Sequence, residues 1–331
     1  MCKTKKKLSL GLLASMIVVA VVVAACGQAT RTTAPTQAEQ PAATQAPATD
    51  TASPPLASPT AAEVGASPAA GAESAPAATN APAAQALPPE PQDVEFQADD
   101  GQSLQGRFYP PATSPAPLVV LMHWAPGDQN EWNAIAPWLQ NRGQAKASQG
   151  NPWLDGSWFP PMLEGQSFAV FTFTFRNCEG GCKSFTRDAW LLDAQAAMRK
   201  ATQLEGIDPN HIVVIGASIG ADGAIDGCGW LNDQSLGNCL GALSLSPGDY
   251  LTVPYKDAVS ALGAEQPPKP AWCLYAEGDG ESRRACEGAA GDNYRRIKYA
   301  GDNHGMYLLQ PDVEPGALEL ILDFLKLTLG L

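Results

Sequence analysis

Hydrophobic residues are distributed unevenly along this chain, and their pattern divides it into three segments. Residues 8–25 form an apolar run without a charged side chain. Residues 28–92 are mostly Ala, Pro, Thr, Ser and Gln, and they contain only three larger apolar residues. Strand-like and helix-like patterns of apolar positions begin near residue 93, which predicts one folded domain over residues 93–331.

The apolar runs of this domain predict a series of β-strands. Residues 93–97 and 103–109 flank the turn signal Asp99-Asp100-Gly101 and predict an antiparallel hairpin. The runs that follow are continuous, which is typical of strands buried on both faces. They are residues 117–122 (PLVVLM), 167–175 (SFAVFTFTF), 211–215 (HIVVI), 242–245, 271–275 and 296–299.

Apolar residues at helical spacing indicate a helix over residues 186–204 and a closing amphipathic helix over residues 315–329. Buried strands that alternate with helices predict a doubly wound, mostly parallel sheet with helices on both faces. In such sheets ligands bind beyond the carboxyl ends of the strands. The chemistry is therefore expected just after Met122, Phe175, Ile215, Leu245, Tyr275 and Tyr299.

The composition agrees with a single domain of this kind. All 24 Phe, Trp and Tyr lie at or after Phe96, so the residues before it cannot build an ordinary core. The remaining ~240 residues are a suitable length for one α/β domain. The net charge is −13, and it is −17 without the four lysines of the first seven residues, which argues against nucleic acid as a partner.

The N-terminus predicts export. Residues 1–7 carry positive charge, and the apolar run after them ends in small residues, which together indicate a signal peptide over residues 1–25. The sequence VAAC at 23–26 resembles the lipobox of bacterial lipoproteins, and this implies that Cys26 is lipidated and becomes the new N-terminus. The alternative is a retained helical anchor, with Cys26 a bystander. Both interpretations place the domain in the cell envelope, outside the cytoplasm and tethered to a membrane.

Residues 26–92 are predicted to form a disordered tether. They have too few apolar side chains to offset the entropy lost on ordering. A flexible coil of this length would span about 45 Å root-mean-square. Its expected role is to hold the domain clear of the envelope.

A candidate nucleophile follows the strand predicted at residues 211–215. The sequence GASIG at 216–220 is a G-x-S-x-G motif between a buried strand and a helix rich in small residues, the context of a nucleophile elbow. Glycines are needed because the serine occupies a strained turn where strand and helix approach closely. Ser218 is therefore the expected nucleophile.

A serine hydroxyl needs a base, and the chain has only three histidines. His211 begins the strand that ends at the elbow, so it lies at the wrong end of the sheet. His123 ends an earlier strand, where it is expected to shape the neighbouring loop. His304 follows the last predicted strand in a loop that can reach the serine, and it is the predicted base.

The third residue must be a carboxylate that orients the imidazole. Asp279 comes just after the strand predicted at residues 271–275, and it gives the chain order Ser, Asp, His of this fold. Glu277 and Glu281 are nearby rivals, and Asp249 is a candidate for a relocated acid. Asp302 lies too close in sequence to the base and is expected to be a turn residue.

Residues 93–331 resemble the α/β-hydrolase superfamily, in particular its dienelactone-hydrolase-like and small esterase branches. The resemblance is carried by GASIG at 216–220, AEGD at 276–279 and DNHG at 302–305. It implies an oxyanion hole made by the amide of Ile219 and by an amide of the loop after the third strand. That loop often contains His-Gly in this superfamily, whereas this chain has His-Trp, so either Trp124 or Ala125 supplies the amide, and Ala125 is favoured. Dienelactone hydrolases have a cysteine nucleophile, so the serine argues against lactone specificity.

Six cysteines remain after Cys2 and Cys26. An even number in an exported domain suggests three disulfides. Neighbours in sequence suggest the pairs Cys178–Cys182, Cys228–Cys239 and Cys273–Cys286, the last of which would close a loop containing Asp279. The rival hypothesis, a zinc site, is disfavoured because the spacings fit no common zinc finger.

Two further features have competing interpretations. Five tryptophans lie between the third strand and the next, and they form either an aromatic wall over the substrate or part of the core; they are Trp124, Trp132, Trp138, Trp153 and Trp158. Asp222 follows the nucleophile by one helical turn, where it is expected to act as a favourable charge at a helix N-terminus.

The sequence therefore predicts an exported, lipid-anchored serine hydrolase that cleaves small-molecule carboxylic esters through an acyl-enzyme, without a cofactor or metal. One alternative is a peptidase of the same fold, although no large cap domain is evident. The other is a catalytically silent hydrolase-like domain used for surface binding.

Overall fold

The computed structural model describes residues 89–143 and 154–331. The predicted signal peptide, Cys26 and nearly all of the predicted tether lie outside the described residues. Within the described part of the chain, no helix combines the length and apolar character that a membrane span requires.

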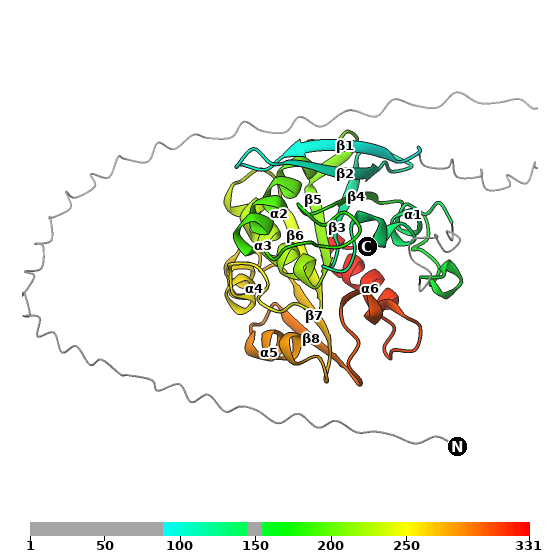
Figure 1. The fold of residues 1–331 in the computed structure, drawn as a ribbon. Coiled ribbons are helices and arrows are strands. Elements are labelled where there is room, and N and C mark those ends of the chain that lie inside the picture. The colour runs from blue at the N-terminus through cyan, green and yellow to red at the C-terminus, as the bar shows by residue number, and fades with distance from the viewer. Residues whose placement is uncertain (1–88, 144–153) are drawn as a thin grey trace, which may run out of the picture. The chain divides into compact units, whose positions relative to one another are not determined.

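The described residues are built around one eight-stranded sheet (Figure 1). The strand order is β1-β2-β4-β3-β5-β6-β7-β8. The first two strands pair antiparallel with each other, β2 pairs antiparallel with β4, and all later neighbours are parallel. The strands are β1 (Gln92–Gln97), β2 (Ser103–Tyr109), β3 (Ala116–Met122), β4 (Ala169–Phe173), β5 (Ile207–Ala217), β6 (Cys239–Leu245), β7 (Ala271–Ala276) and β8 (Tyr294–Tyr299).

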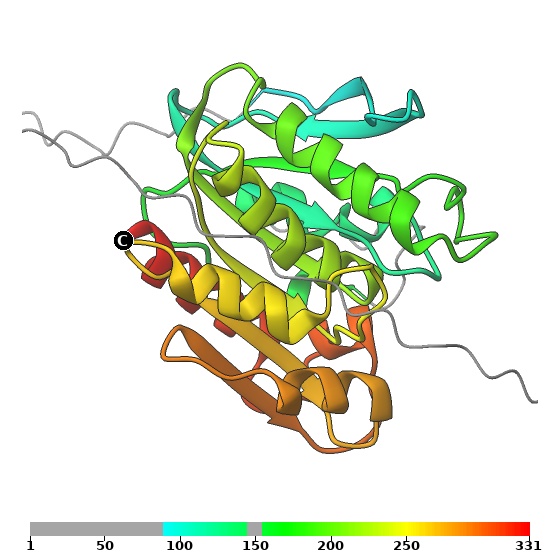
Figure 2. The same cartoon turned by 90° about the vertical axis from the view of Figure 1, so that its left-hand side faces the viewer.

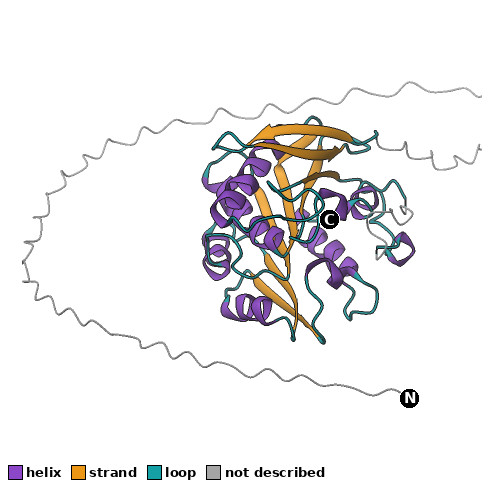
Figure 3. Ribbon diagram, viewed as in Figure 1, coloured by secondary structure: helices purple, strands orange, loops and turns teal. Residues whose placement is uncertain are grey.

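The helices cover both faces of this sheet (Figure 3). Figure 1 shows α2, α3, α4 and α5 on one face and α1 and α6 on the other, and Figure 2 views the first face directly. The helices are α1 (Ile135–Leu139), α2 (Arg187–Ala201), α3 (Ile219–Asp233), α4 (Tyr255–Ala264), α5 (Gly280–Gly288) and α6 (Ala317–Leu329), with short 3-10 turns η1 (Gln129–Trp132), η2 (Gly156–Trp158) and η3 (Gly305–Leu309). The predicted doubly wound, mostly parallel sheet is confirmed.

Each face of the sheet has its own core, because the central strands are buried on both sides. Alternate residues of β3 divide between the two: Val120 packs with the α2–α3 side, and Val119 and Leu121 pack with the α1–α6 side. All residues of β4 and β7 are buried. Continuous apolar runs are the expected sequence of such strands.

Two of the predicted strands differ from the structure at their ends. Strand β5 begins four residues earlier than predicted, because Ile207 already pairs with Ala116 before a register shift. Strand β4 ends at Phe173 rather than at residue 175. The backbone N–H of Phe175 instead donates to the His123 side chain, so this segment leaves the sheet to support the site.

The six cysteines of the domain form three disulfides. The pairs are Cys178–Cys182, Cys228–Cys239 and Cys273–Cys286, the ones that sequence neighbours suggested. Each bridge joins segments close in sequence, and the third joins β7 to α5 around the turn that carries Asp279.

Candidate active site

Ser218 lies at the sharp turn between β5 and α3. Its backbone has φ +53° and ψ −118°, a conformation that a side chain with a Cβ rarely adopts. The Ser218 N–H donates to the Leu245 carbonyl at 2.8 Å, which fixes the turn to the end of the neighbouring strand β6. The residue is only 4% exposed.

The two glycines of the motif are needed for steric reasons. A Cβ at Gly216 would lie 1.8 Å from the Gly220 carbonyl oxygen. A Cβ at Gly220 would lie 2.3 Å from the Met122 carbonyl oxygen and 2.6 Å from that of His123. The first glycine therefore allows the tight turn, and the second brings α3 against the end of β3.

His304 links the serine to a carboxylate. Its Nε2 lies 2.9 Å from Ser218 Oγ, and its Nδ1 lies 2.6 Å from Asp279 Oδ2. An ionised carboxylate can only accept, so Nδ1 carries the proton and Nε2 is left to accept from the serine hydroxyl. The structure thus brings together the three residues that the sequence nominated.

The histidine and the acid are each held by a further contact. The Gly305 N–H, next to the histidine, donates to the buried Ser246 Oγ at 2.9 Å. Asp279 is the N-cap of α5, and its Oδ1 accepts from the Ser282 N–H at 3.4 Å while Oδ2 faces His304. One carboxylate therefore both starts a helix and orients the imidazole.

The rival acids interact elsewhere. Glu277 pairs with Lys298 at 3.3 Å on the surface. Asp249 Oδ1 accepts from the Tyr255 N–H at 2.6 Å. Asp302 is exposed in the segment that follows β8.

The other two histidines have structural surroundings. His123 is fully buried, its Nδ1 donates to the Trp124 carbonyl at 2.7 Å, and its Nε2 accepts from the Phe175 N–H at 3.0 Å. Burial lowers the pKa of His123 to about 4, so the ring stays neutral. His211 is exposed near the start of β5, where it pairs with Asp208 at 2.7 Å.

The sequence nominated the amides of Ile219 and Ala125, or Trp124 in place of Ala125, for an oxyanion hole. Ile219 is the first residue of α3, so its N–H has no partner within the helix. Ala125 belongs to residues 123–128, which follow β3 and which we call the oxyanion loop. Its carbonyl accepts from the Cys182 N–H at 2.8 Å. Trp124 is buried, with its ring 5.1 Å from that of Tyr307.

The oxyanion loop is clasped by the small loop that the Cys178–Cys182 bridge closes. In addition to the contact at Ala125, the Gly180 N–H donates to Asp128 Oδ2 at 2.8 Å. A Cβ at Gly181 would lie 2.9 Å from the Pro126 carbonyl oxygen, so the two backbones are in close contact. Residues 178–182, the clasp loop, therefore support the oxyanion loop along its length.

Glu131 is buried and packs against the oxyanion loop. Burial raises the pKa of Glu131 to about 7, although a hydrogen bond with the Trp124 side chain opposes the shift. A Cβ at Gly127 would meet this side chain at 2.4 Å, so Glu131 packs directly against the loop backbone.

The expectation for Asp222 was wrong. Its side chain lies in the first turn of α3 as expected, but it does not act simply as a charge at the helix end, because it is 1% exposed and its oxygens accept from the N–H groups of Gly248 and Tyr250. Burial raises the pKa of Asp222 to about 7. A sequence signal existed: every residue from 219 to 225 except Asp222 is small or apolar, which favours a buried helix.

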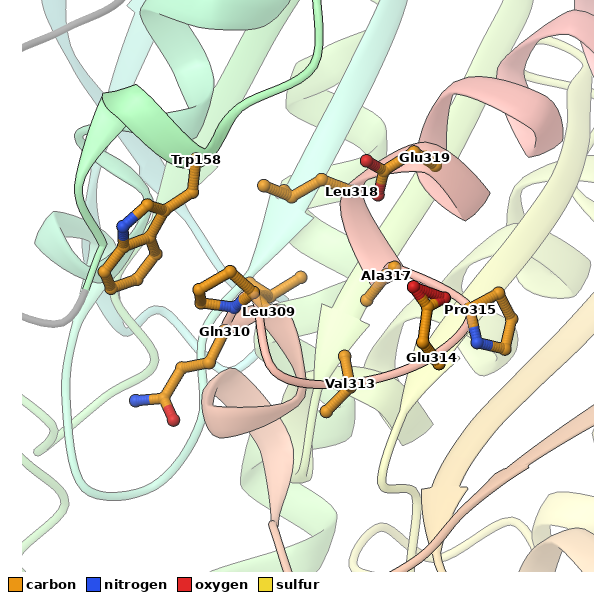
Figure 4. A pocket seen from close by; sticks show the side chains of 11 residues that line it. Trp158, Leu309, Gln310, Val313, Glu314, Pro315, Ala317, Leu318 and Glu319 are labelled. Carbon is orange, nitrogen blue, oxygen red and sulfur yellow. The ribbon is translucent and has the colours of Figure 1, made fainter.

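Most of the tryptophans that could have formed a wall are core residues. Trp124, Trp132 and Trp138 are buried, which agrees with the packing interpretation, and Trp153 lies outside the described residues. Trp158 instead lines a cavity of about 340 Å³ formed with residues 309–319. In Figure 4 its indole lies on one side of this cavity and Pro315 and Glu319 lie on the other. None of the three triad residues lines it.

Within residues 89–143 and 154–331, no cluster of three or more His, Cys, Asp or Glu side chains is arranged to hold a metal ion. The hydrogen bond between Ser218 and His304 is suited to proton transfer between these two side chains.

Comparison with solved structures shows the α/β-hydrolase fold. The thermostable carboxylesterase EstE1, cloned from a metagenomic library, aligns with a TM-score of 0.50 and 18% identity, over 74% of this chain and 92% of that one. The α/β hydrolase GrgF from Penicillium aligns with the same TM-score and 14% identity, over 73% and 100%. An esterase from Rhizomucor miehei also gives 0.50, at 14% identity, over 75% and 84%.

Among curated sequences, the chain is similar to the uncharacterized protein YfhR of Escherichia coli. The strain K12 protein is 32% identical over 136 residues, which are 41% of this chain and 40% of that protein. The O157:H7 protein is 33% identical over 130 residues, 39% and 38% of the two chains. The chain therefore spans about two fifths of the length of these relatives. No family model matches the sequence.

Proposed function

We propose that this protein is a serine carboxylesterase that works through an acyl-enzyme. The observation that carries the proposal is the hydrogen-bonded series from Ser218 through His304 to Asp279, with distances of 2.9 and 2.6 Å. The likeness in fold to one protein described as a carboxylesterase and another described as an esterase supports it. A strained serine at a strand–helix turn, with an imidazole in hydrogen-bond reach, has the geometry of an activated nucleophile.

In the first step, Ser218 Oγ forms a bond to the ester carbonyl carbon while its proton passes to His304 Nε2. The negative charge that develops on the carbonyl oxygen is stabilised by the amides of Ile219 and Ala125. Collapse of this intermediate breaks the bond to the alcohol oxygen, which takes the proton from Nε2. The acid leaves later, after water attacks the acyl-enzyme and His304 accepts and returns a proton in the same way.

Asp279 contributes by fixing which ring nitrogen carries the proton. Because its Oδ2 accepts from Nδ1, Nε2 is free to receive the serine proton, and the carboxylate stabilises the imidazolium that forms. The Asp279 side chain is 11% exposed, which limits the screening of this interaction by water.

The test is active-site labelling of the full-length protein with a fluorophosphonate, followed by mass spectrometry and by turnover of a panel of simple esters. We expect label on Ser218, none in Ser218→Ala, and ester turnover that disappears with the label. A folded protein that is neither labelled nor active would refute the proposal and favour the surface-binding alternative. Labelling together with cleavage of peptides but not esters would favour the peptidase.

We further propose that the chain is exported and anchored through a lipid on Cys26. The three disulfides of the domain support an oxidising compartment. Metabolic labelling with an alkyne fatty acid should modify the wild type and not Cys26→Ser. Equal labelling of both proteins would contradict lipidation at this residue.

A further inference from the structure

An exposed aromatic side chain lies at one end of a series of rings that reaches the candidate base. Phe185, in the segment before α2, is 59% exposed although it is a large apolar residue. Its ring stands edge-on to Trp190 at 5.1 Å and to Tyr250 at 6.4 Å. The Tyr250 ring in turn stands edge-on to His304 at 6.3 Å. The series thus leads from solvent to the imidazole.

Tyr250 is held in this position from several directions. Its N–H donates to the buried carboxylate of Asp222. Its ring packs over Gly248, where a Cβ would lie 2.3 Å from a ring atom. The Arg187 side chain donates to the next carbonyl, that of Leu251, at 2.6 Å. Such a preformed surface loses little entropy when a ligand binds to it.

The position of Phe185 is informative when it is compared with other exposed apolar side chains. Among the described residues, five large hydrophobic side chains are exposed: Phe185, Leu236, Tyr307, Leu327 and Leu331. Leu236 follows the far end of α3, and the two C-terminal leucines belong to α6 or follow it. Phe185 and Tyr307 instead belong to ring contacts that include His304 and the oxyanion-loop residue Trp124. Exposed apolar surface at a reactive site favours ligand binding.

We propose that Phe185 and Tyr250 form a subsite for an aromatic ring of the ester substrate. This inference rests on the proposed esterase function and specifies its substrate class. Aromatic rings prefer edge-to-face contacts at the centroid separations seen here, so a substrate ring can join the existing series. The ring should carry no negative charge, because the Tyr250 phenol already hydrogen-bonds Glu281, whose carboxylate would repel an anion.

The experiment compares kcat/KM of the full-length protein for matched pairs of esters. Methyl phenylacetate against methyl octanoate places the ring on the acyl side, and benzyl acetate against heptyl acetate places it on the alcohol side. We expect the wild type to prefer the aromatic member of one pair. The pair that shows this preference tells whether the subsite binds the acyl side or the alcohol side of the ester. Phe185→Ala should lower that preference about 10-fold, chiefly through KM. Leu236→Ala, also a loss of an exposed apolar side chain, should leave it unchanged.

Two further variants separate the ring from mere apolar bulk. Phe185→Leu keeps an apolar side chain and should lose most of the preference, whereas Tyr250→Phe keeps the ring and should retain it. The proposal is overturned if Phe185→Ala lowers kcat/KM equally for the aromatic and the aliphatic ester of each pair, or if it lowers kcat/KM for neither ester. It is also overturned if the wild type shows no aromatic preference.

A binding measurement keeps the subsite testable without turnover. By calorimetry, the aromatic member of at least one of the two ester pairs should bind Ser218→Ala more tightly than its aliphatic counterpart does, and adding Phe185→Ala should weaken binding of that aromatic ester about 10-fold. If esters are not hydrolysed but this binding pattern holds, the esterase proposal fails and the aromatic subsite stands. If esters are hydrolysed and the pattern is absent, the subsite fails alone.

Discussion

The turn that carries Ser218 and the oxyanion loop lie side by side, but they are stabilised in different ways. The turn at residues 216–220 depends on missing side chains: both of its glycines face backbone atoms at distances where no Cβ fits. The oxyanion loop depends on added contacts from residues about 50 positions later, through the clasp loop and Phe175. One region is specified locally and sterically, and the other by long-range polar contacts and a disulfide.

The difference determines how each region should fail. A steric turn tolerates no enlargement, because its neighbours are backbone atoms that cannot move aside. A loop held by several polar contacts should lose function by steps as contacts are removed. The predictions below are ordered by their expected effect on turnover.

The largest effect is expected for Gly220→Ala. Its Cβ would meet the Met122 and His123 carbonyl oxygens at 2.3 and 2.6 Å, so α3 must move away from β3. We expect a loss of about 3 kcal/mol in unfolding free energy and at least a ~100-fold fall in kcat/KM. Gly229→Ala is the control: in the same helix, its Cβ has only a Leu262 side-chain atom within reach, at 3.8 Å. It should stabilise the protein by up to about 1 kcal/mol.

The second effect is expected on removal of the Cys178–Cys182 bridge by a double serine substitution. The loosened clasp loop should release Ala125 and lower kcat about 10-fold, with a stability loss of about 2 kcal/mol. The matched control is the double serine variant of Cys228–Cys239, whose longer loop predicts a larger loss of about 3 kcal/mol. Turnover and urea unfolding should be measured for both variants. We expect the variant without the Cys178–Cys182 bridge to be the less active of the two, although it is the less destabilised. The opposite order would mean that activity merely follows stability.

A smaller effect, about a 3-fold loss of kcat, is expected for Asp128→Asn. The wild-type carboxylate accepts from the Asn130 N–H through Oδ1 and from the Gly180 N–H through Oδ2. The amide retains one acceptor, so the cap persists and the contact with the clasp loop is lost. Asp155→Asn makes the same change in a cap that accepts from the Ser157 N–H at 2.9 Å. It should not alter kcat, and an equal fall in both variants would show that the contact with the clasp loop is not the cause.

Glu131→Gln should affect stability and its pH dependence rather than turnover. The folded-state pKa of Glu131 is raised to about 7 from 4.5, so the folded protein binds the extra proton and is favoured at low pH. The wild type should therefore lose stability as the pH rises from 4.5 through 7, and glutamine removes this loss. The difference in unfolding free energy between the two proteins should grow by about 1–3 kcal/mol between pH 5 and 8.5. A difference that stays constant in urea titrations across this range would contradict the raised pKa.

The same contrast explains what could be predicted from the sequence. The glycine spacing around Ser218 is a local steric requirement, and Asp279 and His304 follow recognisable strands, so position along the chain was enough to nominate them. Nothing in the sequence near Ala125 indicates that its carbonyl accepts from the Cys182 N–H, because that contact depends on the path of the chain after β4. The hydrogen-bond partners of the buried Asp222 could not be predicted for a related reason. Its partners at residues 248 and 250 lie on a different loop, after β6.

The order of strands in the sheet also determines at which stage of folding the site can form. Ser218 follows β5 in the middle of the sheet, whereas Asp279 and His304 follow β7 and β8 at one edge, and Ser218 and His304 are 86 residues apart. The hydrogen bond between them therefore forms only once the last strand of the chain has docked. Contacts of such long sequence separation form late when a protein refolds. Recovery of serine reactivity should thus follow the docking of β8 during refolding, and a chain that is still emerging during synthesis carries its nucleophile in an inactive state.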